Sequence, residues 1–199
     1  KKPVMILARG IEHFSFSSAA LSLGLGQDSL VWTPARSDFT TDTKALDETL
    51  ANLPDHCEPF MVVSVAGNCR TTGIDDILGM RDVCDRHGLW LHIDACHGGN
   101  LLFSKQMRHR LHGIAMAESV SLDPHKGLFV GYPCSYVLFR DSTALQYICR
   151  YPDKFHDPDC LDLGLIMPFY GSRGFHSLKL WLLMRHLGVD GLGELIEQR

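Results

Sequence analysis

The sequence has 199 residues, 45% of them hydrophobic, which is enough for one domain with a buried core. Its formal net charge is −4, and charges of both signs are interspersed, so the basic face that nucleic-acid binding needs is missing. No run of about 18 apolar residues predicts a transmembrane helix, and no signal peptide is visible. We therefore expect neither a nucleic-acid nor a membrane partner.

The seven cysteines are odd in number, and no two of them have CxxC spacing. This pattern argues against the disulfide framework of a secreted protein and favours reduced thiols in a cytoplasmic protein. The chain starts almost directly in a predicted strand and stops within a helical pattern, so we expect it to be a fragment of a longer protein.

The predicted elements alternate between strands and helices along the chain. Strands are predicted at 4–7, 30–32, 60–66, 89–93, 119–122 and 135–139, and helices at 15–23, 42–53, 75–88, 105–111 and 174–187. Asp42 and Asp75 are the predicted N-caps of the second and third helices, and Gly88 is the predicted end of the third. Repeated strand-helix-strand units predict an α/β fold with a mostly parallel sheet flanked by helices.

Three segments of chemical interest follow predicted strands: the loop after Gly67, the end of the strand at Asp94, and the segment that contains Lys126. Ligands of parallel sheets bind at the carboxyl ends of the strands. We therefore expect these segments to lie on one side of the sheet.

A lysine directly after a buried strand has two interpretations. Lys126 is either an ordinary solvated loop side chain or an amine that is desolvated enough to lose its proton and attack an aldehyde.

Asp94 shares one face of its predicted strand with His92 and Cys96. All three are metal-ligand types, but one straight strand rarely supplies three ligands to one ion, so we expect no metal. A carboxylate at a buried strand end needs a cationic partner, and a protonated pyridine nitrogen would be one. Asp94 and Lys126 together are the two groups that pyridoxal 5'-phosphate (PLP) chemistry requires.

The segment around Lys126 resembles the lysine-site signature of group II PLP-dependent amino-acid decarboxylases, which include glutamate, cysteine-sulfinate and aromatic amino-acid decarboxylases. The matching positions are Ser119-Val120, Lys126-Gly127-Leu128, Tyr132-Pro133-Cys134 and Arg140. Other segments are similar to family motifs in the same order: His13-Phe14-Ser15, Ala66-Gly67 with Gly73 to Ile77, Leu89 to Ala95 with Gly98-Gly99, and Gly171-Ser172-Arg173 with Leu178 to Trp181 and Arg185.

The resemblance implies the large domain of a fold-type-I PLP-dependent transferase. Residues 1–199 would form part of this PLP-binding domain, with an N-terminal segment and a small C-terminal domain outside the sequence. It also implies a homodimer that converts an L-amino acid to its amine and CO2.

The resemblance also implies roles at the cofactor. Lys126 would form the Schiff base, Asp94 would pair with the pyridine nitrogen, and His13 would stack on the ring, the alternative for His13 being an ordinary loop histidine. Ala95 would pack near the ring, and His125 would contact the phosphate.

Some positions depart from the family pattern or fall outside the cofactor's immediate surroundings. Asn68, with Cys69, stands in the cofactor loop where the family usually has Thr-Thr. Asp123 stands where many members have Asn, and a carboxylate near a phosphate is unfavourable unless it points away or is protonated. His156 falls at the position of the family's proton-donating tyrosine and could serve as the acid. Arg173 would lie near the substrate or form a structural ion pair.

Three alternatives stay open from the sequence. The stretch from Asp94 to Gly99 also resembles sphingosine-phosphate lyases, which would mean carbon-carbon lyase chemistry. Without the family's tyrosine, the product could be an aldehyde. A non-catalytic fragment or partner subunit is the third reading.

Overall fold

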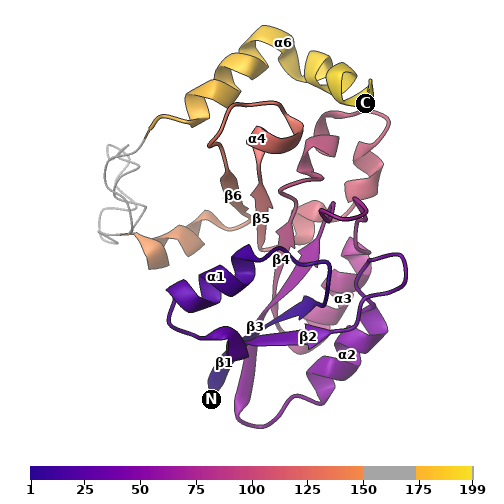
Figure 1. Ribbon diagram of the computed structural model, residues 1–199, viewed down its shortest axis with the longest axis vertical. Helices are drawn as coiled ribbons and strands as arrows, with labels where there is room; N and C mark the ends of the chain where they lie inside the picture. The colour runs from indigo at the N-terminus through magenta and orange to yellow at the C-terminus, as the bar shows by residue number, and fades with distance from the viewer. Residues whose placement is uncertain (150–173, 199) are drawn as a thin grey trace.

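The computed structural model describes residues 1–149 and 174–198, and within them the strands form one six-stranded sheet (Figure 1). The strand order is β2-β1-β3-β4-β5-β6. The strands are β1 (Lys2–Ala8), β2 (Leu30–Thr33), β3 (Cys57–Val65), β4 (Trp90–Asp94), β5 (Ser119–Leu122) and β6 (Tyr136–Phe139). All neighbouring pairs are parallel except β5 and β6, which are antiparallel. The predicted α/β fold with a mostly parallel sheet is therefore confirmed.

The helices are α1 (Ser15–Ser22), α2 (Thr43–Ala51), α3 (Ile77–His87), the short α4 (Pro124–Gly127) and α6 (Ser177–Glu197). Four of these helices correspond to predicted ones, and the short α4 was not predicted. Short 3-10 helices among the described residues span Gln27–Ser29, Gly99–Phe103, Arg108–Leu111, Ile114–Met116 and Ser142–Ile148. No helix in the described ranges combines the length and apolar character that a membrane crossing needs.

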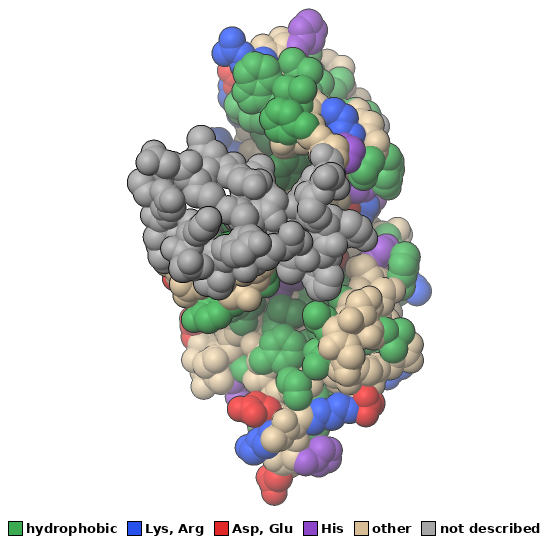
Figure 2. All heavy atoms as spheres, turned by 90° about the vertical axis from the view of Figure 1, so that its left-hand side faces the viewer, with side chains coloured by type: hydrophobic (Ala, Val, Ile, Leu, Met, Phe, Trp, Pro, Cys, Tyr) green, Lys and Arg blue, Asp and Glu red, His purple; other side chains and the backbone are tan. Residues whose placement is uncertain are grey.

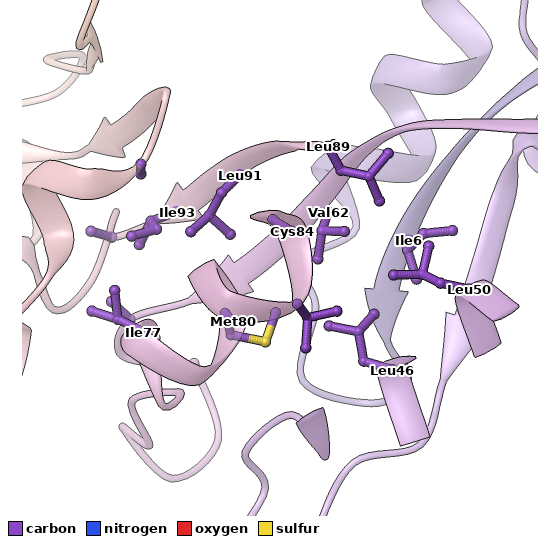
Figure 3. Packing of buried hydrophobic residues seen from close by; sticks show 14 of the residues in the cluster. Ile6, Leu46, Leu50, Val62, Ile77, Met80, Cys84, Leu89, Leu91 and Ile93 are labelled. Atoms are coloured by element: carbon purple, nitrogen blue, oxygen red, sulfur yellow. The ribbon is translucent and has the colours of Figure 1, made fainter. Parts of the chain in front are cut away.

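Alternation along β1 distributes its side chains between two hydrophobic layers. Val4 and Ile6 point into a core that α2 and α3 cover, with Leu46, Met80 and Leu91 fully buried in it (Figure 3). On the opposite face of the sheet, residues of β1, β2 and β3 pack with Ala20 of α1. Burial of each large apolar side chain contributes about 1.5–3 kcal/mol, so helices on both faces hold the sheet in place.

Of the two predicted helix caps, one is confirmed and one is wrong. The Asp42 side chain accepts hydrogen bonds from the amides of Lys44 and Ala45 at the start of α2, as expected. At α3 the cap is Asp76, which accepts from the Gly79 amide. The carboxylate of Asp75 instead points back to the sheet, because four donors compete for it inside the protein. They are the amide and hydroxyl of Thr41, the Ser64 hydroxyl and the Val65 amide.

The predicted helix at 105–111 is reduced to a 3-10 turn at Arg108–Leu111. Its first amides are engaged by side chains: the Gln106 amide donates to Glu197, and the Met107 amide donates to the Ser104 hydroxyl. These bonds do not themselves exclude an α-helix, because its first amides have no partner within the helix. The predicted segment is short, and the chain leaves the helical conformation at His112, so only a 3-10 turn forms. Helix α6 extends ten residues beyond its predicted end at 187, with a non-helical residue at Gly188.

Candidate active site

A cavity of about 310 Å³ lies at the carboxyl edge of the sheet. Each parallel strand except the outermost contributes to its wall through the residues that end or follow it. These are His13 after β1, Gly67 and Cys69 after β3, Asp94, Cys96 and His97 at and after β4, and Asp123 and Lys126 after β5. The expectation that the three segments meet on one side of the sheet is confirmed, because the strands that precede them are parallel neighbours.

A second hollow, of about 470 Å³, lies along α6 and is lined mainly by apolar side chains, including Phe175 and Trp181. Hydrophobic atoms also gather at the upper end of the molecule in Figure 2, where α6 lies. The hollow along α6 is lined by none of the predicted catalytic or cofactor-binding residues. The smaller, polar cavity is therefore the candidate active site.

Two glycines bring the loops after β3 and β4 into backbone contact at the cavity. Gly67 has φ 93°, and a Cβ there would lie 2.7 Å from the Gly98 nitrogen. A Cβ on Gly98 would lie 2.4 Å from the Ala66 carbonyl oxygen, which accepts a hydrogen bond from the Gly98 amide. Only glycine fits at both positions, so this contact fixes how the two loops border the cavity.

Asp94 ends β4 with its carboxylate at the cavity wall. Its Oδ1 accepts hydrogen bonds from the Cys96 amide at 3.1 Å and the Ser121 hydroxyl at 3.3 Å. No described lysine, arginine or histidine lies within ion-pair distance of it. The residues thus offer a fixed negative charge that lacks a cationic partner among the described side chains.

Lys126 lies in α4, and its Nζ is 3.0 Å from Oδ2 of Asp123. Burial acts to lower the pKa of Lys126, but the hydrogen bond and negative charge of Asp123 outweigh it and raise the pKa above its usual value. The neutral amine that desolvation alone would produce is therefore not the form favoured here. The structure instead favours an ammonium whose side chain is 27% exposed.

His13 lines the same cavity from the segment that joins β1 to α1. Its Nδ1 lies 2.9 Å from the Ser15 hydroxyl, and its ring centroid is 4.2 Å from that of Phe14. A flat ring at the cavity wall is compatible with the predicted stacking role, which stays a prediction.

Three other predicted cofactor residues do not line the cavity. His125 lies behind Asp123, with Nδ1 donating to the Cys134 carbonyl at 2.7 Å and its ring 3.9 Å from that of Tyr132. Ala95 is fully buried in the core. The Asn68 side chain accepts hydrogen bonds from the amides of Arg70 and Thr71 in its own loop and donates to the Phe39 carbonyl of a distant segment. Its neighbour Cys69 reaches the cavity. His156 and Arg173 lie outside the described residues.

The cavity residues Ser121, Ser135 and Tyr136 were not predicted from the sequence. Ser121 pairs with Asp94 in the register of β4 and β5, and this pairing is visible only when the strand neighbours are known. Within the described ranges, no group of three or more His, Cys, Asp or Glu side chains could hold a metal ion.

The sequence pattern of the pyridoxal-dependent decarboxylase conserved domain matches residues 1–199. The chain belongs to this family. The predicted resemblance is thereby confirmed, and the cofactor of this decarboxylase-family protein is pyridoxal 5'-phosphate.

Individual relatives agree with the family assignment. The chain is 37% identical to cysteine sulfinic acid decarboxylase of Mus musculus, over 94% of this chain and 39% of that protein. It is 32% identical to the acidic amino acid decarboxylase GADL1 of Xenopus tropicalis, over 94% of this chain and 38% of that protein. The sequence therefore spans well under half the length of these relatives.

Solved structures show the same fold. The crystal structure of mouse CSAD matches with a TM-score of 0.91 and 34% identity, over 99% of this chain and 42% of that one. The structure of Oryza sativa TDC with PLP matches with a TM-score of 0.81 and 26% identity, over 98% of this chain and 39% of that one.

The residues of this decarboxylase-family protein fit its cofactor. Asp94 supplies the negative charge that a protonated pyridine nitrogen needs, without a competing cation among the described residues. Lys126 supplies a primary amine on the same cavity wall. These two residues would hold the ring nitrogen and the aldehyde carbon of PLP.

Proposed function

We propose that the protein to which this chain belongs decarboxylates an L-amino acid to its amine and CO2. The observation that carries the proposal is that Asp94 and Lys126 line the same cavity at the carboxyl edge of the sheet. Bound PLP supplies an electron sink for the negative charge that develops at Cα when the carboxylate leaves.

The chain's own residues would prepare this step in distinct ways. The carboxylate of Asp94 would keep a positive charge at the ring nitrogen, and Ser121 and the Cys96 amide fix its direction. Lys126 would hold the cofactor through its primary amine. His13, which lines the cavity from the β1–α1 segment, would cover the ring and exclude water there. His156 remains the proposed proton donor at Cα, and Arg173 the proposed substrate contact.

For the substrate, we propose an acidic L-amino acid as the class to test first. The support is that relatives with at least 30% identity are named as cysteine sulfinic acid and acidic amino acid decarboxylases. A second anionic group on the substrate requires a cation, and Arg173 is the residue that the family resemblance offers.

The remaining proposals concern the whole protein. We propose that this chain is part of the large PLP-binding domain of a homodimer, on the basis of the family resemblance. A reducing compartment such as the cytoplasm is supported by five cysteines that are free thiols: Cys57, Cys69, Cys84, Cys96 and Cys134.

The test is a visible absorbance spectrum of the complete protein with PLP, before and after borohydride, followed by peptide mapping. We expect a reducible band and a reduced adduct on Lys126, both lost in Lys126→Ala and both kept in the control Lys44→Ala, which changes an exposed helical lysine. Loss of the adduct should also abolish CO2 release from acidic amino acids.

The products distinguish the alternatives. Amine and CO2 in equal amounts support the proposal. Aldehyde with CO2 would indicate an aldehyde synthase, and aldehyde without CO2 a carbon-carbon lyase. A well-folded dimer that forms no adduct would contradict the enzymatic role altogether.

A further inference from the structure

The cavity contains a second carboxylate, Asp123, which the pairing with a ring nitrogen does not require. Its Oδ2 lies 3.0 Å from Nζ of Lys126 and 3.5 Å from Nε2 of His125. Its side chain is 12% exposed, so the contact with Lys126 is shielded from water more than a surface ion pair is.

The position of Asp123 in the chain makes its orientation informative. It is the N-cap residue of α4, where an aspartate normally accepts a hydrogen bond from an amide of the first turn. The Asp123 side chain makes no such bond. It is directed instead at Lys126, three residues later on the same side of the helix.

Asp123 also keeps its charge in this environment. Burial acts to raise its pKa, but the hydrogen bonds from Ser135 and Lys126 and the charge of Lys126 outweigh burial and lower the pKa below its usual value. A carboxylate is therefore maintained beside the amine that must react with the cofactor.

The other groups that face Lys126 come from β4, from the loop after it and from the segment between β1 and α1. Asp94 adds a more distant negative charge. Burial raises the pKa of the Cys96 thiol to about 12, so this neighbour is a neutral thiol. His13 and His97 line the same cavity, and neither carries a negative charge that could pair with Lys126. Asp123 is thus the one described group in direct ionic contact with the amine.

We propose that Asp123 is a positioning residue that holds Lys126 as an ammonium aimed into the cavity, so that capture of PLP depends on removal of one proton from this pair. The proposal rests on the proposed function, because it assumes that Lys126 captures the cofactor.

The chemistry by which a lysine bonds to the PLP aldehyde explains why capture depends on loss of a proton. The ammonium first gives up one proton to solvent, because only the neutral amine carries the lone pair that attacks an aldehyde. The nitrogen then bonds to the aldehyde carbon, and the carbonyl oxygen leaves as water with the two remaining nitrogen protons, so no oxidant or reductant is needed. A negative partner that stabilises the ammonium lowers the fraction of reactive amine at neutral pH.

The experiment uses the complete protein stripped of cofactor, with PLP as the probe. The rate of adduct formation on Lys126 is followed by borohydride trapping and peptide mass across the pH range in which lysine titrates. Asp123→Asn keeps the shape of the side chain and removes its charge. We expect its capture rate at neutral pH to rise about tenfold, the effect of about one pKa unit.

Two further variants separate charge from structure. Asp190→Asn removes a comparable aspartate–lysine pair, Asp190–Lys105, which is more than 70% exposed on both sides, and should leave the capture rate unchanged. Asp123→Glu keeps the charge and should retain the pH dependence of the unchanged protein.

Competitive labelling of Lys126 in the unchanged, cofactor-free protein gives an independent measurement that needs no variant. We expect the labelling rate of Lys126 to reach half its maximum at a pH above 10.5, the usual pKa of lysine. A value below 10.5, or an identical pH dependence in Asp123→Asn and the unchanged protein, would overturn the proposal and leave the proposed function intact. Absence of any Lys126 adduct at any pH would instead contradict the proposed function.

Discussion

Asp94 is the site residue whose position is defined most clearly by both the sequence and the structure. As the last residue of β4, it is held by the strand, and its Oδ1 is fixed by Ser121 and the Cys96 amide. Lys126 contrasts with it, because burial lowers its pKa while the neighbouring Asp123 raises it, and the net direction is upward. At the scale of single residues, the site therefore combines a carboxylate held in place, Asp94, with an amine, Lys126, whose pKa depends on its neighbour.

Substitution Asp94→Asn tests the role of that anion. The amide oxygen can still accept the bonds from Ser121 and Cys96, so the fold and the capture of PLP at Lys126 should persist. The charge that supports a protonated ring nitrogen is lost, so CO2 release should fall by on the order of 10²-fold or more. Single-turnover CO2 release, measured beside the amount of borohydride-trapped PLP, checks this; activity close to that of the unchanged protein would contradict it.

The elements around the cavity are placed by close backbone packing rather than by long side chains. The loops after β3 and β4 touch through Gly67 and Gly98. Their contact depends on the absence of a Cβ, since the atoms opposite are backbone and cannot rotate away.

Substitution Gly98→Ala should therefore push the two loops apart. We expect a loss of about 1–3 kcal/mol in the free energy of unfolding, together with weaker retention of PLP. Gly131→Ala is the matched control, because a Cβ there meets nothing within 4 Å, and its effect should stay within about 0.5 kcal/mol. Thermal unfolding with and without PLP measures both; equal effects of the two substitutions would show that the contact is not constraining.

At the scale of the whole molecule, one buried ionic network joins elements that are distant in sequence. Glu118, directly before β5, accepts from Arg81 of α3, from the Leu91 amide of β4 and from Arg140 after β6. Arg81 is only 4% exposed, so its charge depends on this partner. The network connects a flanking helix to the half of the sheet that carries Asp94 and Lys126.

Removal of the charge in Glu118→Gln should leave the guanidinium of Arg81 buried without its main partner. We expect a destabilisation of about 3 kcal/mol, measured by urea unfolding. Asp85→Asn removes the other ionic partner of Arg81, which is 64% exposed, and should have a much smaller effect because solvent screens that pair. A comparable loss of stability in both variants would show that the contribution of each ion pair does not depend on its burial.

Much of the fold could be read from patterns that are local in the chain. The strand at 119–122 is observed with the predicted bounds, and Gly88 closes α3 in the left-handed conformation as predicted. One error arose where tertiary contacts competed with local ones: Asp75 was predicted as a cap, but its carboxylate is used by Thr41 and strand β3. The helix predicted at 105–111 is only a 3-10 turn, because so short a segment forms few helical hydrogen bonds.

The sequence by itself determined the family, the strand-helix alternation and the candidate pair Asp94 and Lys126, because residue types, spacing and periodicity are properties of one continuous segment. Only the tertiary structure decided which side chains share a cavity and which charge faces which. It brought Ser121 beside Asp94, turned Asn68 into its own loop, and set Asp123 against Lys126. The physical reason is that electrostatic and hydrogen-bonding energies depend on distances through space, and folding fixes those distances between strands that the sequence keeps apart.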